Sequence, residues 1–281
     1  MNTTKDRPPR QVRSAADAET SVHRRILCIG STGSGKSALI WSLPGRKFVY
    51  AFDPNTIATI QGCPDCDVIE FYPDFLEMDA TLKGFNKGAK SDKPASRREP
   101  TTYMEWVDHI NGFVETEGFK DYDWLVMDSA TFLVRAAMDR QLYINGRYGD
   151  IEDLGDYRVV GSKLSDIFRN MPSLGINIYT TGHFQVYQDD KTKRIVTQLS
   201  LPGSARATLP LGHTDVLKAE FVGGDSRYIV RTVPEPKGLQ EIRTSMRGLD
   251  DEEDVTIKDF RNATHFGIGK LLEKGTKNAI R

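Results

Sequence analysis

The stretch GSTGSGKS, residues 30–37, matches the pattern G-x-x-x-x-G-K-[ST] at every defined position. It follows the apolar stretch HRRILCIG (23–30), typical of a buried strand, and precedes KSALIWSL (36–43), which we expect to be helical. Glycines let such a loop fold tightly, so that backbone N–H groups and the helix N-terminus point at phosphate oxygens. The residues of this predicted phosphate-binding loop are Gly30, Ser31, Thr32, Gly33, Ser34, Gly35, Lys36 and Ser37.

The pattern predicts a nucleoside triphosphate with Mg²⁺ as the ligand of this loop. Lys36 is placed to reach the β- and γ-phosphates, and the Ser37 hydroxyl is placed to bind Mg²⁺. The apolar stretch WLVMD (124–128) supplies a second metal ligand, because it ends in Asp128 and ligands bind at the carboxyl ends of strands in open α/β sheets. The alternative is that Asp128 caps the helix predicted from residue 130.

Predicted strands and helices alternate over the first two thirds of the chain, and predicted antiparallel strands follow from residue 194. This order indicates an α/β fold with a mainly parallel sheet, flanking helices and antiparallel strands in the C-terminal third. The expected parallel strands are 23–30, 47–53, 67–72, 123–128 and 176–181, and the expected helices are 36–43, 101–118, 130–144 and 157–174.

Composition divides the chain into three parts. Residues 1–22 are polar and aperiodic, which predicts a disordered basic tail. Residues 23–245 carry the alternating elements and are expected to form the nucleotide-binding domain, with a flexible Lys/Gly/Ser/Pro-rich insertion at 79–100. Residues 246–281 contain DDEED and then a basic stretch, so we expect an acidic linker and a basic C-terminal tail.

The charge balance is close to neutral, with 38 Lys and Arg against 39 Asp and Glu. That average excludes a uniformly basic protein that coats DNA, but it leaves room for local basic segments such as 83–99, which has six basic and two acidic residues. Three cysteines make no disulfide framework, which indicates a reducing, cytoplasmic compartment. The pair in CPDC (63–66) has the spacing of metal ligands, but no second pair follows to complete a zinc site. No apolar stretch is long enough for a membrane helix.

Four further stretches carry a resemblance to a known family. LVMDSATFLV (125–134) resembles the Walker B segment of RecA-type ATPases, and IYTTGH (178–183) resembles the following strand, whose last polar residue senses the γ-phosphate. LSLPGSARATLP (199–210) and RYIVRTVPEP (227–236) resemble phage-encoded members with only the AAA/RecA core, some of them linked to single-strand annealing and recombination. The resemblance covers roughly residues 23–240 and implies a RecA-like P-loop ATPase domain.

This resemblance assigns roles to individual residues. It gives Asp128 the Walker B role beside Lys36 and Ser37, and it makes His183 a candidate γ-phosphate sensor. RecA-type ATPases place the nucleotide at subunit interfaces, which implies a homo-oligomer and makes Arg231 and Arg206 candidate cations acting on a neighbouring subunit's nucleotide. The alternative for each arginine is an ordinary surface cation.

The family also places DNA-facing loops at 182–194, here GHFQVYQDDKTKR. In this stretch Phe184 and Tyr187 are candidates for stacking on bases, and a solvated hairpin is the alternative. The cations expected to meet DNA phosphates are Lys191, Lys193 and Arg194.

One position departs from the family. RecA-like enzymes carry a glutamate shortly after the second strand, and it orients the attacking water. The matching position here is Asn55, which cannot accept a proton. Asp53 is the nearest carboxylate and could replace it, directly or through a further water, and Glu70 on the next predicted strand is the other choice. We therefore expect slow ATP hydrolysis, or ATP acting mainly as a binding switch.

The sequence thus predicts an ATP-binding and ATP-hydrolysing RecA-like protein that acts on single-stranded DNA in phage recombination or annealing, within a bacterial host cell. A single-strand-binding or other replication protein is a possible further partner. Asn55 keeps open a nucleotide-gated adaptor or loader with little hydrolysis. A small-molecule kinase is the third reading, although Arg97 and Arg98 make a poor lid and no acceptor site is evident.

Overall fold

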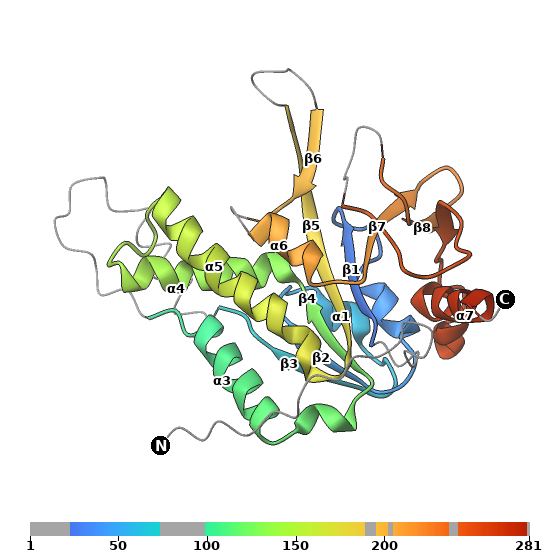
Figure 1. Cartoon of the computed structure of the whole chain (residues 1–281), viewed down its shortest axis with the longest axis horizontal. Helices are drawn as coiled ribbons and strands as arrows, with labels where there is room; N and C mark the ends of the chain where they lie inside the picture. Colours follow the sequence, from blue (N-terminus) through green and yellow to red (C-terminus); the bar gives the residue numbers. More distant parts are fainter. Residues whose placement is uncertain (1–22, 74–98, 189–194, 202–204, 236–240, 280–281) are drawn as a thin grey trace, which may run out of the picture.

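The computed structural model describes residues 23–73, 99–188, 195–201, 205–235 and 241–279. Within these ranges the chain forms a nine-stranded sheet in the order β3-β2-β4-β5-β1-β7-β8-β9, and β6 pairs with β5 outside this path (Figure 1). The parallel strands are β1 (Arg25–Gly30), β2 (Lys47–Ala51), β3 (Cys66–Glu70), β4 (Trp124–Asp128), β5 (Asn177–Gln188) and β7 (Asp215–Val222). The antiparallel strands are β6 (Ile195–Leu199), β8 (Arg227–Arg231) and β9 (Glu252–Asp254).

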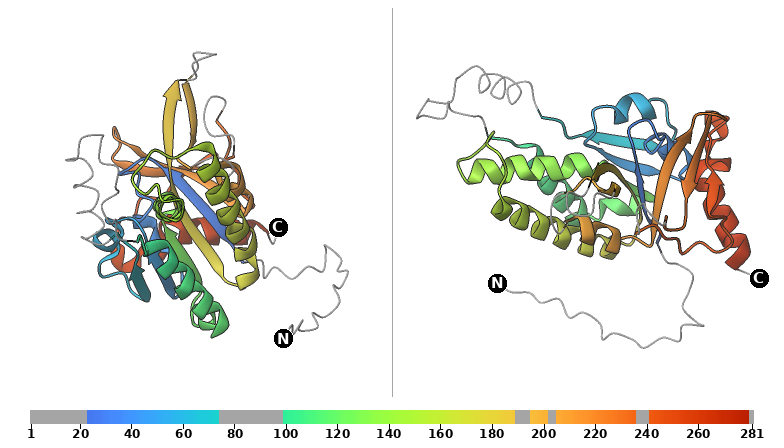
Figure 2. Two further views of the ribbon diagram at one scale, coloured as in Figure 1. Left: turned by 90° about the vertical axis from the view of Figure 1, so that its left-hand side faces the viewer. Right: turned by 90° about the horizontal axis from the view of Figure 1, so that it is seen from above.

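Helices cover both faces of this sheet, because alternate residues of each central strand point to opposite faces and both faces are apolar (Figures 1 and 2). In β1, for example, Leu27 belongs to one core and Cys28 to the other. The first core lies under α3 (Thr102–Glu115), α4 (Ala130–Ile144), α5 (Leu154–Asn170) and α6 (Ala205–Leu211). The second lies under α1 (Thr56–Ile60), α7 (Gly267–Ala279) and the 3₁₀ helix η1 (Ala38–Ser42). Further 3₁₀ helices are η2 (Gly118–Asp121), η3 (Met171–Leu174) and η4 (Phe260–His265).

The predicted fold class is confirmed, although β7, expected among the antiparallel strands, pairs in parallel with β1. Two elements differ most in extent from the prediction. The helix expected over 36–43 is only the five-residue η1. The strand predicted over 176–181 is much longer in the structure, because β5 continues to Gln188 and forms a hairpin with β6 that projects from the sheet (Figure 1). The predicted tail at 1–22 and most of the predicted insertion at 79–100 lie outside the described residues.

The structure corrects the predicted acidic linker and basic tail over residues 246–281. Glu252–Asp254 form β9 against β8, and the Glu253 side chain lies inside the fold, where it accepts a hydrogen bond from Lys274 Nζ at 2.5 Å. Helix α7 buries Ile268 and Leu271, and the Ile268 N–H donates to Ser42 Oγ at 2.8 Å. The C-terminal segment therefore covers η1, the helix that follows the phosphate-binding loop.

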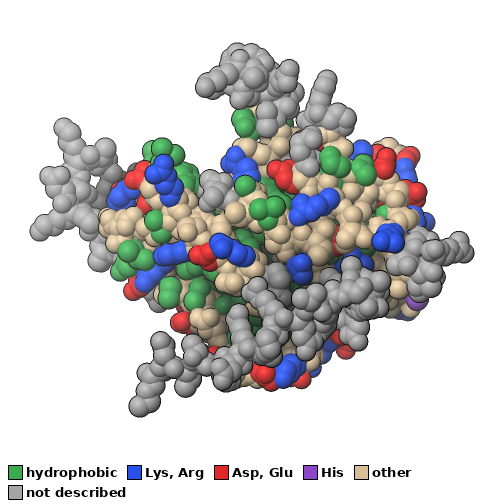
Figure 3. Space-filling view, viewed as in Figure 1, with side chains coloured by type: hydrophobic (Ala, Val, Ile, Leu, Met, Phe, Trp, Pro, Cys, Tyr) green, Lys and Arg blue, Asp and Glu red, His purple; other side chains and the backbone are tan. Residues whose placement is uncertain are grey.

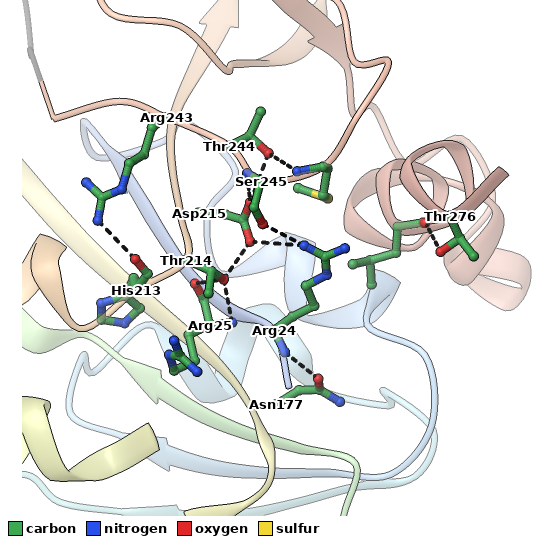
Figure 4. Close-up of polar contacts among 12 residues, drawn as sticks. Arg24, Arg25, Asn177, His213, Thr214, Asp215, Arg243, Thr244, Ser245 and Thr276 are labelled. Atoms are coloured by element: carbon green, nitrogen blue, oxygen red, sulfur yellow. Dashed lines mark hydrogen bonds and ion pairs between the residues drawn. The ribbon is translucent and has the colours of Figure 1, made fainter. Parts of the chain in front are cut away.

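A buried polar cluster holds the end of the sheet opposite to that loop (Figure 4). Asp215, at the start of β7, is fully buried and accepts hydrogen bonds from Thr214 Oγ1 at 2.7 Å and Thr244 Oγ1 at 2.9 Å. The N–H and Oγ of Ser245 donate to the same carboxylate at 2.6 and 3.0 Å, and Arg24 lies 3.9 Å from it. Because a buried charge is tolerated only when it is paired, this cluster fixes the segment after residue 240 to the start of β1 and β7.

His213, next to that cluster, should make the stability of the protein depend on pH. Its ring is hydrogen-bonded to the Leu209 carbonyl at 2.8 Å and to Thr180 Oγ1 at 3.0 Å, and burial lowers its pKa from 6.5 to about 4. Between these values the unfolded chain binds a proton that the folded chain does not, so acid favours unfolding. We expect the free energy of unfolding to fall by about 3 kcal/mol from this group as the pH drops from 7 to below 4.

Urea unfolding of the wild type and of His213→Gln at several pH values measures this contribution. The variant should show a shallower loss of stability between pH 6.5 and 4, because glutamine does not titrate. Equal slopes for the two proteins would contradict the prediction.

Candidate nucleotide-binding site

The phosphate-binding loop connects β1 to η1 and is shaped by its glycines. Gly33 and Gly35 have φ values of +80° and +86°, which disfavour any residue with a side chain. Gly30 is required for a different reason, because a Cβ there would lie 2.6 Å from the Ala219 carbonyl oxygen and 2.2 Å from Ser34 Oγ. Ser31 and Thr32 are exposed at the mouth of the loop.

Lys36 lies inside this loop, with only 6 % of its surface exposed. Its ammonium group donates to the carbonyl oxygens of Gly30 at 3.0 Å and Ser31 at 2.7 Å, and to Ser34 Oγ at 3.4 Å. Burial lowers the pKa of Lys36, although the charges of Asp128 and Asp53 favour the protonated form. The cation is thus held by neutral acceptors next to two carboxylates. Such a cation gains strongly from an anionic phosphate group.

Asp128 ends β4 beside this lysine and is 1 % exposed. One carboxylate oxygen accepts from Thr181 Oγ1 and the other from Thr56 Oγ1 at 2.7 Å. Its backbone carbonyl accepts the N–H groups of Phe52 at 2.6 Å and Asp53 at 3.0 Å, so it also positions the segment after β2. Asp128 does not cap α4, because Ser129 is the N-cap residue. These threonines were not predicted, since nothing in the sequence pairs residues 56 and 181 with residue 128.

The strand order brings the sensor candidate to the same edge. β5 lies between β1 and β4, and its register places His183 opposite Gly30. His183 Nε2 is 3.7 Å from Asp53 Oδ2, and its backbone N–H donates to Thr131 Oγ1 at 3.1 Å. Burial, with the charge of Lys36, lowers the pKa of His183, so the ring is neutral at pH 7. The structure thus brings Lys36, Asp128, Asp53 and His183 together.

The candidates for orienting a water molecule are arranged around Asp53. Asp53 Oδ1 accepts the backbone N–H of Asn55 at 2.9 Å and its side-chain N–H at 3.1 Å, while Glu70 is exposed at the end of β3. Tyr72 is a residue that the sequence did not indicate. Its hydroxyl is buried without a hydrogen-bond partner in the described part of the chain, and burial, with the charges of Glu70, Asp53 and Asp128, raises its pKa to about 12.

Among the described residues, those predicted to face DNA or a neighbouring subunit lie outside the group formed by Lys36, Asp128, Asp53 and His183. Arg231 pairs with Glu220 and Glu235 at 2.8 Å each and with Glu252, so three carboxylates of its own chain engage it. Arg206 donates to the Leu201 carbonyl and to Gln198. Phe184 is partly buried under Lys218, whose Nζ is 5.7 Å from the ring, whereas Tyr187 is 40 % exposed. Residues 191, 193 and 194 lie outside the described residues, and the action of Arg231 or Arg206 on a neighbouring subunit stays a prediction.

The donor set at this edge fits Mg²⁺ and a polyphosphate. A buried carboxylate at Asp128, the half-buried hydroxyl of Ser37, which caps no N–H of η1, and the buried cation of Lys36 are the groups that such a ligand requires. Ser37 and Asp128 would hold Mg²⁺, which would neutralise phosphate charge. Lys36 would orient the phosphates, and the glycine-bounded loop would surround them.

A glycine-bounded loop after the first strand of a mainly parallel sheet, with a buried aspartate at the end of a second strand and a third strand between them, defines a P-loop NTPase. The chain belongs to the AAA domain family, whose pattern matches residues 23–223. It is therefore a nucleotide-binding protein of the P-loop ATPase class.

Among solved structures, the chain is similar to the flagellar accessory protein FlaH from Methanocaldococcus jannaschii. The match is 15 % identical, covers 84 % of this chain and 85 % of that chain, and has a TM-score of 0.40. A likeness at this level carries no argument about activity or partners. No curated protein matches the chain. Among the described residues, no helix is long and apolar enough to cross a membrane.

Proposed function

We propose that this protein binds ATP with Mg²⁺, hydrolyses it slowly, and uses the nucleotide to control its hold on single-stranded DNA during phage recombination or strand annealing. One observation carries the proposal. Strand β5 contributes His183 to the nucleotide edge and then continues into the projecting hairpin, where Val186 is 56 % and Tyr187 40 % exposed. A ligand at the hairpin and a nucleotide at the loop would therefore act on one continuous strand.

Slow hydrolysis follows from the groups around Asp53. Asn55 cannot take a proton from water. Asp53, which accepts two hydrogen bonds from Asn55, is a partly exposed carboxylate close to Lys36 and His183. We expect Asp53→Asn to lower kcat by about 100-fold, the usual range for loss of a general base. Asn55→Glu should raise kcat, because it restores a proton acceptor.

Phosphate release at saturating ATP measures both effects. Asp67→Asn is the matched control, since Asp67 is an exposed acid of β3 that pairs with Arg46. An unchanged kcat in Asp53→Asn would remove Asp53 from this role. If the wild type turns over ATP no faster than Lys36→Ala does, the result would favour the alternative function of a nucleotide-gated adaptor, which binds ATP without consuming it.

The DNA part of the proposal predicts binding that depends on salt and on Tyr187. A fluorescent oligo(dT) should bind in the presence of ATP, with an affinity that falls steeply with salt because phosphate contacts release counterions. Stacking on an aromatic ring contributes about 1–3 kcal/mol per base, so Tyr187→Ala should weaken binding by about tenfold or more. DNA should also increase the rate of ATP hydrolysis.

Phe221→Ala is the control for that variant, because Phe221 is an aromatic residue of similar exposure, 50 %, on the β7–β8 hairpin. Fluorescence anisotropy gives the affinities. Absence of an anisotropy change with wild-type protein at low salt would refute the proposed DNA function.

A further inference from the structure

A cavity of about 500 Å³ opens at the base of the β5–β6 hairpin. Helices α4, α5 and α6 and the end of β5 contribute its walls, and its size falls within the range of about 300–1,000 Å³ that ligand sites have. Val134, Met138 and Leu201 give it an apolar floor, while Gln185 and Arg206 add polar groups. In the space-filling view, the surface on the side of α4 and α5 also mixes hydrophobic side chains with Lys and Arg (Figure 3).

The charge of Arg206 is the strongest indication of the ligand. Its Nε and Nη2 donate to the Leu201 carbonyl at 3.2 and 3.0 Å, and Nη1 donates to Gln198. In the described part of the chain it forms no ion pair, whereas Arg135, on the same cavity wall, is paired with Asp139 and Glu152. A half-buried guanidinium held by neutral acceptors favours an anionic ligand, and its planar donors suit phosphate.

We propose that this cavity binds one nucleotide unit, with the base against the apolar floor and the phosphate at Arg206, and that in the functioning protein the unit belongs to single-stranded DNA. This assignment rests on the function proposed above. An apolar floor takes the flat base, the Gln185 amide can pair with a base edge, and the cation takes the phosphate. A free mononucleotide has the same chemistry, and the test below separates it from the strand.

The cavity is also connected to the nucleotide edge. Thr131 lines the cavity, and its Oγ1 accepts the backbone N–H of His183 at 3.1 Å. Thr131 lies in the first turn of α4, three residues after Asp128, which ends β4, and Gln185 follows His183 by two residues on β5. An occupant therefore touches α4, which follows the strand that ends in Asp128, and β5, which carries His183. A nucleotide unit in the cavity that favours one position of the Thr131–His183 contact would therefore strengthen ATP binding. By linkage, bound ATP would strengthen the binding of the nucleotide unit by the same factor.

The test compares Arg206→Ala, Arg206→Lys and Arg169→Ala, using full-length protein with ATP and fluorescent oligo(dT). Arg169 is an exposed arginine of α5 paired with Asp166, and it serves as the control. Loss of one phosphate contact should weaken binding about tenfold and reduce the slope of log affinity against log salt by about one, and lysine should restore the slope. A merely structural role for Arg206 would not move the salt slope. Ser200→Phe, which places a ring in the cavity, should lower the affinity with Arg206 intact.

The outcomes separate the two proposals. If oligo(dT) binds and Tyr187→Ala weakens it, but Arg206→Ala and Ser200→Phe bind like the wild type, the cavity assignment is overturned and the DNA function stands. If wild-type protein binds no oligo(dT), the DNA function fails and the cavity assignment fails with it. Competition by dTMP as strong as that by oligo(dT), at equal nucleotide concentration, would overturn assignment to the strand. Competition by oligo(dT) alone would support it.

Discussion

Lys36→Ala is expected to abolish ATP hydrolysis, with a loss of at least 100-fold in kcat and a clear loss of ATP affinity. Removing one preorganised donor from an active site commonly costs about 10²–10³ in rate. Lys36 is such a donor, because the loop carbonyls of Gly30 and Ser31 already hold its ammonium group in place beside Asp128. The neutral alanine would leave developing phosphate charge without this cation.

Lys47→Ala is the matched control for that experiment. Lys47 is also buried, 3 % exposed, and its Nζ also donates to two carbonyls, those of Leu43 at 3.2 Å and Gly45 at 2.8 Å. It lies at the opposite edge of the sheet, where β2 begins. Both variants lose a buried cation with carbonyl partners, so both should lose stability. Only Lys36→Ala should lose ATP binding, measured by calorimetry, and equal affinities in the two variants would contradict the assignment.

The fold and the centre of the site could be predicted because their signals are local. The phosphate-binding loop is a continuous pattern, and Asp128 ends an apolar strand, so neither depends on knowing which distant residues meet. Their proximity then follows from the rule that parallel strands present their carboxyl ends on one edge. Alternation of strands and helices fixed the layers for the same reason.

What could not be predicted depends on contacts between distant residues. The stretch DDEED reads as solvated, yet Glu253 lies inside the fold because Lys274 approaches it from a helix twenty-one residues further along the chain. That helix is held by Ser42, more than two hundred residues away. Thr56, in a helix, and Thr181, in a strand, likewise carry no signal in the sequence until folding brings their hydroxyls to Asp128. Such partners become visible only when the chain is folded.

The electrostatics of the site explain why its acids have different roles. Asp128 is buried and receives two threonine hydroxyls, which suits a metal ligand of fixed orientation. Asp53 is 14 % exposed, faces the neutral ring of His183 and accepts a hydrogen bond from the Asn55 N–H. This partly open position suits contact with water. In the proposed function, separating a fixed ligand from a water-facing carboxylate would let one edge of the sheet both hold the metal and orient water.

Asp128→Asn should therefore separate metal binding from folding, with kcat reduced by about 100-fold or more and with ATP affinity that no longer depends strongly on Mg²⁺. Asparagine has the shape of aspartate. One of the hydroxyls of Thr56 and Thr181 can keep donating to its amide oxygen while the other rotates to accept its N–H, so the loop should stay folded. The lost negative charge removes a main attraction for the metal. Titration of ATP binding with Mg²⁺, together with phosphate release, measures both effects.

Asp215→Asn is the matched control for this last variant. Asp215 is equally buried and also receives threonine hydroxyls, from Thr214 and Thr244, but it lies at the opposite end of the sheet. Its replacement should lower the free energy of unfolding and leave the Mg²⁺ dependence of ATP binding intact. If Asp128→Asn instead kept both the wild-type turnover and the wild-type Mg²⁺ dependence, Asp128 would be a structural acid like Asp215, and the metal would have to be held by other residues at this edge.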